Sequence, residues 1–216
     1  MVQERAVETR NQIVHGAAEV FDTEGFAGAS IGMIVAAAGT TRGALHFHFR
    51  TKEELAKAVM EEQGLRELAA IQKLDDGKTP AIEQVVMLAH EMVRLTKNDP
   101  VVRAGVRLSL ELTFVDSPKE PYLGCIMACE EMIRRAIMEG DIIDTVSPPI
   151  LARFTISAFM GVQLVSTVLT ERRDLEQRVD EMWDTILLGI MPGRRRRKAD
   201  QVRAARWCSA AESPAG

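Results

Sequence analysis

The chain has 216 residues, of which 46% are hydrophobic and 27% are charged, and its net charge is −4. This is an ordinary soluble globular composition, and three cysteines, an odd count, exclude the disulfide framework of a small secreted domain. Glycine and proline are few, which favours an all-helical fold. No apolar run approaches the ~20 residues of a membrane span, and the charged start, MVQERAVETR, lacks the apolar core of a signal peptide. We therefore expect a cytoplasmic protein with no membrane partner.

Charge is distributed unevenly along the chain. Residues 194–216 carry seven lysines and arginines against Asp200 and Glu212, so the rest of the chain is acidic. An acidic body does not exclude nucleic-acid binding, because the patch that faces the phosphates decides the attraction. The basic run at 194–198 could be a second phosphate contact or a membrane-surface patch, but we favour a solvated, disordered tail.

The first predicted helix runs from Arg5 to Glu24 and ends at Gly25. Its apolar residues recur with helical spacing and form one stripe: Ile13, Ala17, Val20 and Phe21. Arg5 and Arg10 lie near its start, where a DNA contact and a solvated helix face are equally compatible with the sequence.

Residues 30–55, SIGMIVAAAGTTRGALHFHFRTKEEL, predict two short helices and the start of a long one. Gly39 separates the two short helices, because a left-handed residue is needed where the first one stops. Thr40 or Thr41 can cap the second short helix, and Thr51 with Glu54 fits a capping box for the long one. Two short helices joined by a glycine turn are typical of a DNA-reading helix-turn-helix.

The rest of the chain predicts a helical body. Its helices are separated by turn residues and span residues 51–73, 81–97, 100–112, 122–139, 150–169 and 174–190. Asp75–Pro80 is a predicted turn and Asp116–Pro121 a predicted loop. We predict a three-helix helix-turn-helix head at 1–50, a ligand-binding and dimerisation body at 51–192 whose first helix (51–73) connects the two, and a basic tail at 193–216.

The pattern IVAxxGTTRGALxFHFxxKEEL at residues 34–55 resembles the DNA-binding signature of the TetR family of bacterial repressors. The resemblance implies a dimer that binds a pseudo-palindromic double-stranded DNA operator through this head. It also implies that a small-molecule effector releases the dimer and that the last two long helices form the homodimer interface. A two-fold dimer is physically sensible, because two recognition helices about 34–36 Å apart read successive turns of a duplex.

The resemblance and the chemistry of base reading together give an expected set of DNA-contacting residues: Ser30, Thr40, Thr41, Arg42, Gly43, His46, His48 and Lys52. Arg42 stands where relatives usually carry lysine, and His46 stands where they mostly carry tyrosine. His48 and Lys52 match phosphate-binding positions of the family. We assign Leu45, Phe47 and Phe49 to the core of the head.

The His46-Phe47-His48 sequence could also indicate a metal site, but no third ligand is spaced nearby, so phosphate contact is the better interpretation. We expect no metal and no cofactor. Cys125 and Cys129 lie one helical turn apart without zinc or redox partners, so we interpret both as small apolar residues. Neither has the neighbouring base that a nucleophilic cysteine requires.

The body has a narrower resemblance. Three segments, DPVVRAGVRL at 99–108, FxGVQxVS at 159–166 and MW at 182–183, look like the γ-butyrolactone receptor branch of the family. Repressors of this branch act on antibiotic-biosynthesis and regulatory promoters and leave DNA when a small autoregulator binds. The branch usually carries a tryptophan over the lactone at the position that Cys125 occupies here. Two explanations of this departure remain: a different ligand fills the pocket, or the protein is a receptor homologue that responds to an antibiotic or a pathway intermediate. We favour the second.

Helix phase and family analogy together predict the lining of an effector pocket: Gln63, Leu88, Met92, Leu95, Val106, Leu110, Cys125, Ile126, Cys129, Phe159 and Gln163. Two other classes of function remain as alternatives to a ligand-responsive repressor. One is a helical interaction module that does not bind DNA, and the other is a cysteine-dependent enzyme, for which the sequence offers no base.

Overall fold

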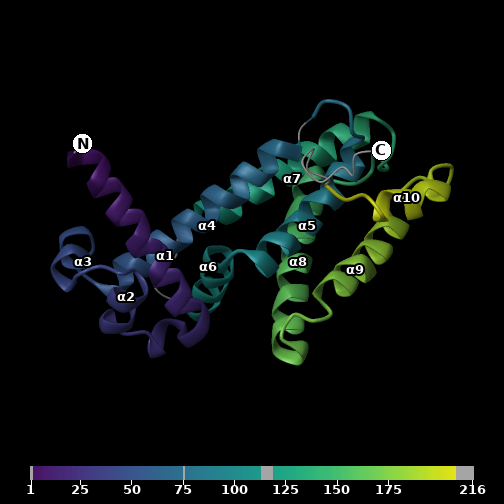
Figure 1. Cartoon of the computed structure of the whole chain (residues 1–216). Helices are drawn as coiled ribbons and strands as arrows, with labels where there is room; N and C mark the ends of the chain where they lie inside the picture. Colours follow the sequence, from purple (N-terminus) through teal and green to yellow (C-terminus); the bar gives the residue numbers. More distant parts are fainter. Residues whose placement is uncertain (1, 75, 113–118, 208–216) are drawn as a thin grey trace, which may run out of the picture. The chain divides into compact units, whose positions relative to one another are not determined.

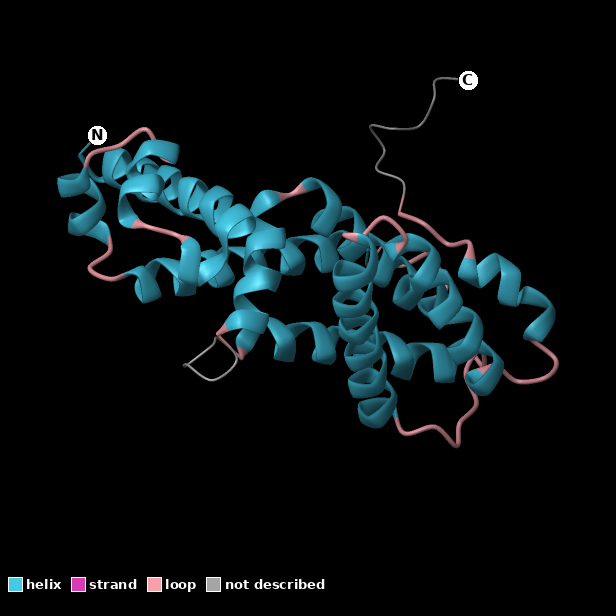
Figure 2. Cartoon of the chain, turned by 90° about the horizontal axis from the view of Figure 1, so that it is seen from below, coloured by secondary structure: helices cyan, strands magenta, loops and turns pink. Residues whose placement is uncertain are grey.

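The protein is described here by a computed structural model, which covers residues 2–74, 76–112 and 119–207. Every regular element in these ranges is a helix (Figure 2). They are α1 (Val2–Gly28), α2 (Ile31–Ala37), α3 (Arg42–His48), α4 (Lys52–Leu74), α5 (Ala81–Asn98), α6 (Pro100–Glu111), α7 (Glu120–Met138), α8 (Pro148–Thr170), α9 (Leu175–Ile190), the 3₁₀ helix η1 (Arg196–Lys198) and α10 (Ala199–Arg203). Asp75 of the predicted turn and residues 116–118 of the predicted loop lie outside the described residues. The all-helical prediction is confirmed.

The chain folds as two compact units. The first comprises residues Met1–Glu67 and Leu95–Pro121, and the second comprises Leu68–Arg94 and Tyr122–Gly216. Three helices, α4, α5 and α7, have residues in both units. This division differs from the predicted boundary at residue 50, because the first unit extends to Glu67 and also includes Leu95–Pro121.

The first unit packs α2 and α3 beside α1 (Figure 1). Its core is a continuous apolar cluster in which Phe21, Ile34, Leu45 and Leu55 are fully buried. These four residues come from α1, α2, α3 and α4 in turn, so each helix contributes apolar residues to one core. Burial of such stripes is the main force that holds helices of this length together.

The three-helix head of the prediction is too small, because α6 belongs to the same core. Val101, Ala104 and Leu108 recur with helical spacing along α6 and join the cluster with no more than 1% exposure. Asp99 caps the start of α6, since its carboxylate accepts hydrogen bonds from the amides of Val101 at 2.9 Å and Val102 at 3.4 Å. The head is therefore closed by a helix that lies far away in the sequence.

Local sequence signals place the helix ends of the head. Gly39 has a φ of 59°, the left-handed conformation that the glycine turn requires. Thr41 caps α3, and its hydroxyl accepts the amide N–H of Ala44 at 3.1 Å. Thr51 does the same for the amide of Glu54, whose carboxylate in turn accepts the amide of Arg50 at 2.7 Å. The predicted caps at Thr41 and Thr51 are confirmed.

The second unit is built around α8 and α9, which pack side by side. Leu175, Val179 and Trp183 of α9 are almost fully buried. By length and composition alone α8 is apolar enough to cross a membrane, contrary to the expectation that no stretch approaches a span. Its inner face, however, carries the polar residues Thr155 and Ser166, which suits a helix that packs against protein.

The basic segment after α9 differs from the predicted disordered tail, in the part that the structure describes. Residues 196–203 are helical and Val202 is only 2% exposed. Arg206 donates a hydrogen bond to the Asp180 carboxylate of α9 at 2.8 Å, and Gln201 donates to Glu83 of α5 at 3.0 Å. Two acidic residues of α9, Asp180 and Asp184, thus pair with Arg206 and Arg203 of a segment that would be solvated if it stood alone.

Arg206 also lies near a buried histidine. The Nε2 atom of His90 is 3.4 Å from Oδ1 of Asp180, the same oxygen that pairs with the guanidinium of Arg206. Burial lowers the pKa of His90 to about 4, and the positive charge of Arg206 adds to this effect. His90 is therefore neutral at ordinary pH, and Asp180 is paired with Arg206 instead.

Candidate nucleic-acid interface and effector site

The first turn of α3 presents a largely exposed surface. Thr41, Arg42, Gly43 and His46 are all exposed, while Leu45 is fully buried on the opposite side of the helix. Arg42, Gly43 and His46 fall on one face because positions separated by three and four residues are neighbours on a helix. The helix thus offers a cation, a position without a side chain and an imidazole to an external partner.

Two of the predicted contact residues already have a structural task. The hydroxyls of Ser30 and Thr41 cap α2 and α3, and Ser30 accepts the amide N–H of Met33 at 3.3 Å. Thr40 and His48 are half-buried beside them. The guanidinium of Arg42 has no partner among the described residues, so it is free to bind a base edge or a phosphate.

Phe47 is the clearest departure from the predicted head. It was assigned to the core, but it is 81% exposed, whereas Phe49 is only 4% exposed. Helix phase could have found this, because Phe47 is only two residues after the buried Leu45, whereas Phe49 is the extended residue that ends α3. The Phe47 ring packs edge-on against the His48 ring with centroids 5.1 Å apart and otherwise faces solvent. An exposed aromatic side chain therefore joins the surface of Arg42 and His46.

Lys52 is engaged differently from the predicted phosphate contact. Its ammonium group donates hydrogen bonds to the carbonyl oxygens of Phe26 at 2.7 Å and Ala29 at 3.0 Å. It also lies 4.5 Å from the centre of the Phe26 ring, a cation–π contact. This side chain stabilises the connection between α1 and α2, and a phosphate would have to share its remaining donor.

The predicted effector residues are divided between the two compact units. Gln63, Leu95, Val106 and Leu110 belong to the first unit. The second unit contains the other seven: Leu88, Met92, Cys125, Ile126, Cys129, Phe159 and Gln163. Of the first group, Leu110 is 42% exposed, so its side chain does not line an enclosed space within that unit.

The two predicted polar anchors have different environments. The Gln63 amide donates to the Glu67 carboxylate at 2.8 Å, so it is already used within α4. Gln163 on α8 is 4% exposed, and its buried Oε1 atom accepts no hydrogen bond from the described residues. A buried acceptor without a donor is costly, which makes Gln163 the stronger candidate for contact with a bound molecule.

The cysteines of α7 are free thiols. Cys129 is fully buried, and burial raises its pKa to about 12, so the thiol is protonated and unreactive at ordinary pH. Cys125 is half-buried. In the described ranges no three His, Cys, Asp or Glu side chains gather in a way that could hold a metal ion.

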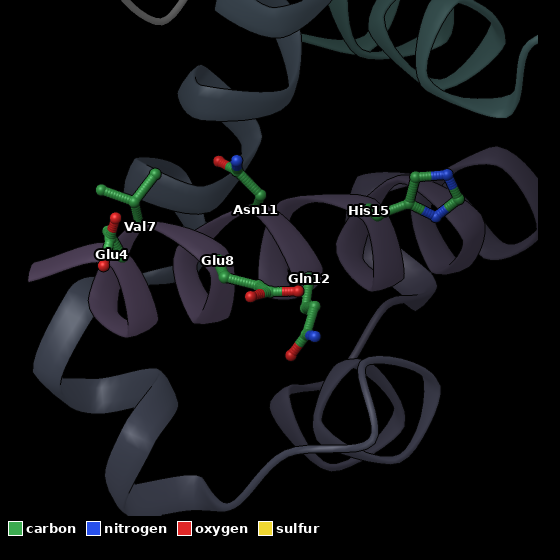
Figure 3. Close-up of a pocket in the computed structure, with 6 residues that line it drawn as sticks. All are labelled: Glu4, Val7, Glu8, Asn11, Gln12 and His15. Atoms are coloured by element: carbon green, nitrogen blue, oxygen red, sulfur yellow. The ribbon is translucent and has the colours of Figure 1, made fainter. Parts of the chain in front are cut away.

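An open hollow of about 880 Å³ runs along one face of α1 (Figure 3). Six residues line it, all from this helix: Glu4, Val7, Glu8, Asn11, Gln12 and His15. Five of the six residues have polar side chains, two of them acidic, and the hollow is open to solvent, unlike the enclosed sites that bury small effectors. None of the predicted effector residues contributes to it.

Comparison with known families agrees with this arrangement. The model of the bacterial regulatory proteins of the tetR family matches residues 13–59, and that of the tetracyclin repressor-like C-terminal domain matches residues 79–192. The fold and the exposed α3 surface thus define a helix-turn-helix transcriptional regulator rather than an enzyme. The second match alone covers more than half of the chain, and the chain belongs to the TetR family.

Individual relatives narrow the comparison. The chain is 35% identical over 188 residues to the A-factor receptor protein of Streptomyces griseus, and it spans 66% of that relative's length, with 87% of this chain covered. Three solved structures are similar. One concerns the control of antibiotic production by bacterial hormones (33% identity, TM-score 0.80, 86% of this chain and 99% of that one). Another is an ArpA-like γ-butyrolactone receptor, with 30% identity and a TM-score of 0.77 over 93% of this chain and 96% of that one. The third is CprB of Streptomyces coelicolor with its operator, with 29% identity and a TM-score of 0.74 over 93% of this chain and 96% of that one.

The exposure of Phe47 generates a test with a matched control two residues away. Phe47→Ala should change stability by no more than ~0.5 kcal/mol, the usual range for an exposed site. Phe49→Ala should destabilise the protein by about 3–5 kcal/mol, because it removes a buried ring. Urea unfolding of both variants measures the difference, and equal losses would contradict the exposed position. Phe47→Ala should also weaken binding to duplex DNA several-fold, because an apolar ring can contact a thymine methyl group.

Proposed function

We propose that this protein is a dimeric repressor that binds a pseudo-palindromic DNA operator and leaves it when a small molecule binds the body. The observation that carries the proposal is the exposed face of α3, where Arg42, Gly43, His46 and Phe47 stand together on a helix of TetR-family type. The CprB structure with its operator supports DNA as the partner, since CprB is similar along 93% of this chain.

Each residue of this face has a chemical role in the proposal. Arg42 forks onto guanine or onto a phosphate, and Gly43 lets the backbone approach the duplex. Phe47 supplies an apolar contact to a thymine methyl. His46 and His48 donate to phosphates, which set the register on the duplex without reading sequence.

Replacing Arg42 tests the assignment of the recognition helix. Arg42→Ala should weaken binding to a short palindromic duplex by at least about tenfold, because a good bidentate contact contributes roughly 1–3 kcal/mol. The fold should be unchanged, since no described side chain pairs with this guanidinium. Anisotropy titrations at several salt concentrations measure the loss. Arg153→Ala, at an exposed arginine of α8, is the control, and retained binding by Arg42→Ala would count against α3 as the reader.

The dimer in this proposal forms through the outer faces of α8 and α9. The exposed apolar side chains of this pair include Phe154 and Val168 of α8 and Leu188 of α9, each more than half exposed. A groove of about 420 Å³ between the two helices is lined by ten residues, among them Gly161, Val165 and Met182. Large exposed apolar surface of this kind is typical of protein–protein interfaces.

A charge placed in this surface should separate the protomers. Val168→Asp should raise the dimer dissociation constant by at least about tenfold, because an unpaired carboxylate would be buried in an apolar interface. Met138→Asp on α7 is the matched control, since Met138 is 78% exposed and Val168 is 73% exposed. Sedimentation equilibrium distinguishes the two variants. Equal dimer strength in Val168→Asp and the wild type would exclude α8 from the interface.

The proposed effector binds within the body, with Gln163 as its polar anchor. A hydroxyl or amide of the effector would donate to the unpaired Oε1 atom of Gln163, and Phe159 and Ile126 would supply apolar contact. The similarity to the A-factor receptor and to a γ-butyrolactone receptor supports an autoregulator-like molecule. Cys125 offers less surface than the tryptophan usual in that branch, which favours an antibiotic or a pathway intermediate. Genes of secondary metabolism are the proposed targets.

A release assay tests the class of effector. The wild-type protein bound to its operator should be released by a member of an antibiotic panel and not by a γ-butyrolactone, because Cys125 cannot stack over a lactone ring. Cys125→Trp should shift the response toward the lactone by restoring the flat surface. Gel-shift titration measures both, with Cys125→Ser as the control for loss of the thiol. Efficient release of the wild type by the lactone would contradict the choice of effector and leave DNA binding intact.

A non-DNA interaction module remains the alternative class. Binding to DNA should weaken steeply with salt, because lysines and arginines displace counterions from the phosphates. An interaction module would show no such dependence and no preference for a palindrome. The same titrations that test Arg42 therefore separate the two functions.

A further inference from the structure

The connection between α1 and α2 is an unusual piece of backbone. The helix of α1 is interrupted at Gly25, which has φ 72° and ψ 179°, and the chain then turns through Phe26 to the cap of α2 at Ser30. A Cβ atom at Gly25 would lie 2.6 Å from a nitrogen of Arg107 and 2.6 Å from an oxygen of Glu111. Both side chains come from α6, so this helix closes directly on the backbone of the corner.

The contacts of these two side chains are complementary. Arg107 donates to the carbonyl oxygens of Asp22 at 2.8 Å and Thr23 at 3.1 Å, in the last turn before the interruption. Glu111 accepts the amide N–H of Phe26 at 2.6 Å, just after it. The guanidinium and the carboxylate also bind one another at 2.7 Å. Arg107 and Glu111 therefore form a clamp that satisfies backbone groups on both sides of Gly25, which the helix itself cannot pair.

The surroundings hold the clamp in place. Arg103, one turn earlier on α6, pairs with the carboxylate of Asp22 at 2.8 Å. Gly105 lies against Gln63 of α4, where a Cβ atom would come within 2.1 Å of the Gln63 side-chain oxygen. With α6 packed closely against both α1 and α4, the clamp is fixed relative to the core of the first unit.

We propose that Arg107 and Glu111 are positioning residues for DNA recognition. They fix the corner at residues 22–29, which leads directly into α2 and then into the recognition helix α3. Without the clamp, α2 and α3 keep their own caps, their buried residues and the Lys52 contacts, but their orientation relative to α1 is fixed less firmly. This inference rests on the proposed function, since it concerns how the α3 surface meets an operator.

The test compares the affinity and spacing preference of variants of the full chain. Arg107→Gln and Glu111→Gln keep the size of the side chains and remove the charges of the clamp. Arg134→Gln is the matched control, because Arg134 and Glu130 form an i,i+4 pair of the same chemistry on α7, in the second unit. The DNA is a duplex selected by the wild-type protein from a randomised pool, with two further duplexes in which the centre gains or loses one base pair.

We expect both clamp variants to bind the selected duplex about tenfold more weakly, the effect of losing a charge-assisted hydrogen bond. Their preference for the selected spacing should shrink, because a loosely oriented head accepts a shifted half-site. Affinity for random-sequence DNA and the behaviour of Arg134→Gln should match the wild type.

Two results would overturn the proposal. Clamp variants with wild-type affinity and spacing preference would show that orientation does not depend on Arg107 and Glu111. An equal loss of affinity for selected and random DNA would assign the pair to the stability of the head alone. If the proposed function itself is wrong, the wild-type protein will select no duplex from the randomised pool, which distinguishes that failure from the two results above.

Discussion

The recognition helix α3 is only seven residues long, and a helix of that length does not persist in water, because the cost of its first turn is not recovered. Burial of Leu45 and Phe49 in the core of the first unit stabilises it, together with the cap at Thr41. The buried side fixes the rotation of the helix about its axis, so the same contacts decide that Arg42 and Phe47 face solvent. DNA reading in the proposed function thus depends on an apolar contact that never touches DNA.

The second unit meets a different constraint at the turn between α8 and α9. Glu171 and Arg172 both have positive φ there, a conformation that costs free energy for residues other than glycine. Asp174 offsets this cost by accepting hydrogen bonds at 2.6 Å from the hydroxyls of Ser166 and Thr170. These bonds also lower the pKa of Asp174 to about 2, so the carboxylate is ionised at ordinary pH. With the turn held by polar contacts, the apolar outer faces of the two helices are left for the proposed partner.

The sequence predicted the features that local chemistry decides. The left-handed Gly39 and the cap at Thr41 follow from the residues themselves, and the apolar stripes of the helices follow from their spacing. The assignment of Phe47 failed because a residue two positions after the buried Leu45 points away from the core side of α3. Lys52 and the tail around Val202 could not be placed, because their partners lie far away in the sequence. A periodic pattern contains no information about which distant carbonyl or carboxylate will stand opposite a cation.

The sequence pattern also could not show that α6 packs into the head, because α6 lies far from α1–α3 along the chain. Because Ala104 and Leu108 of α6 belong to the core of the head, the head is not an independent three-helix domain that a connecting helix merely carries. Effector coupling of about 1–3 kcal/mol is enough to shift operator affinity some 5- to 150-fold. One hydrogen bond to a charged group contributes a similar roughly 1.5–3 kcal/mol. In the proposed function, loss of a single contact between Arg107 or Glu111 and the corner would therefore be comparable in free energy to a typical effector coupling.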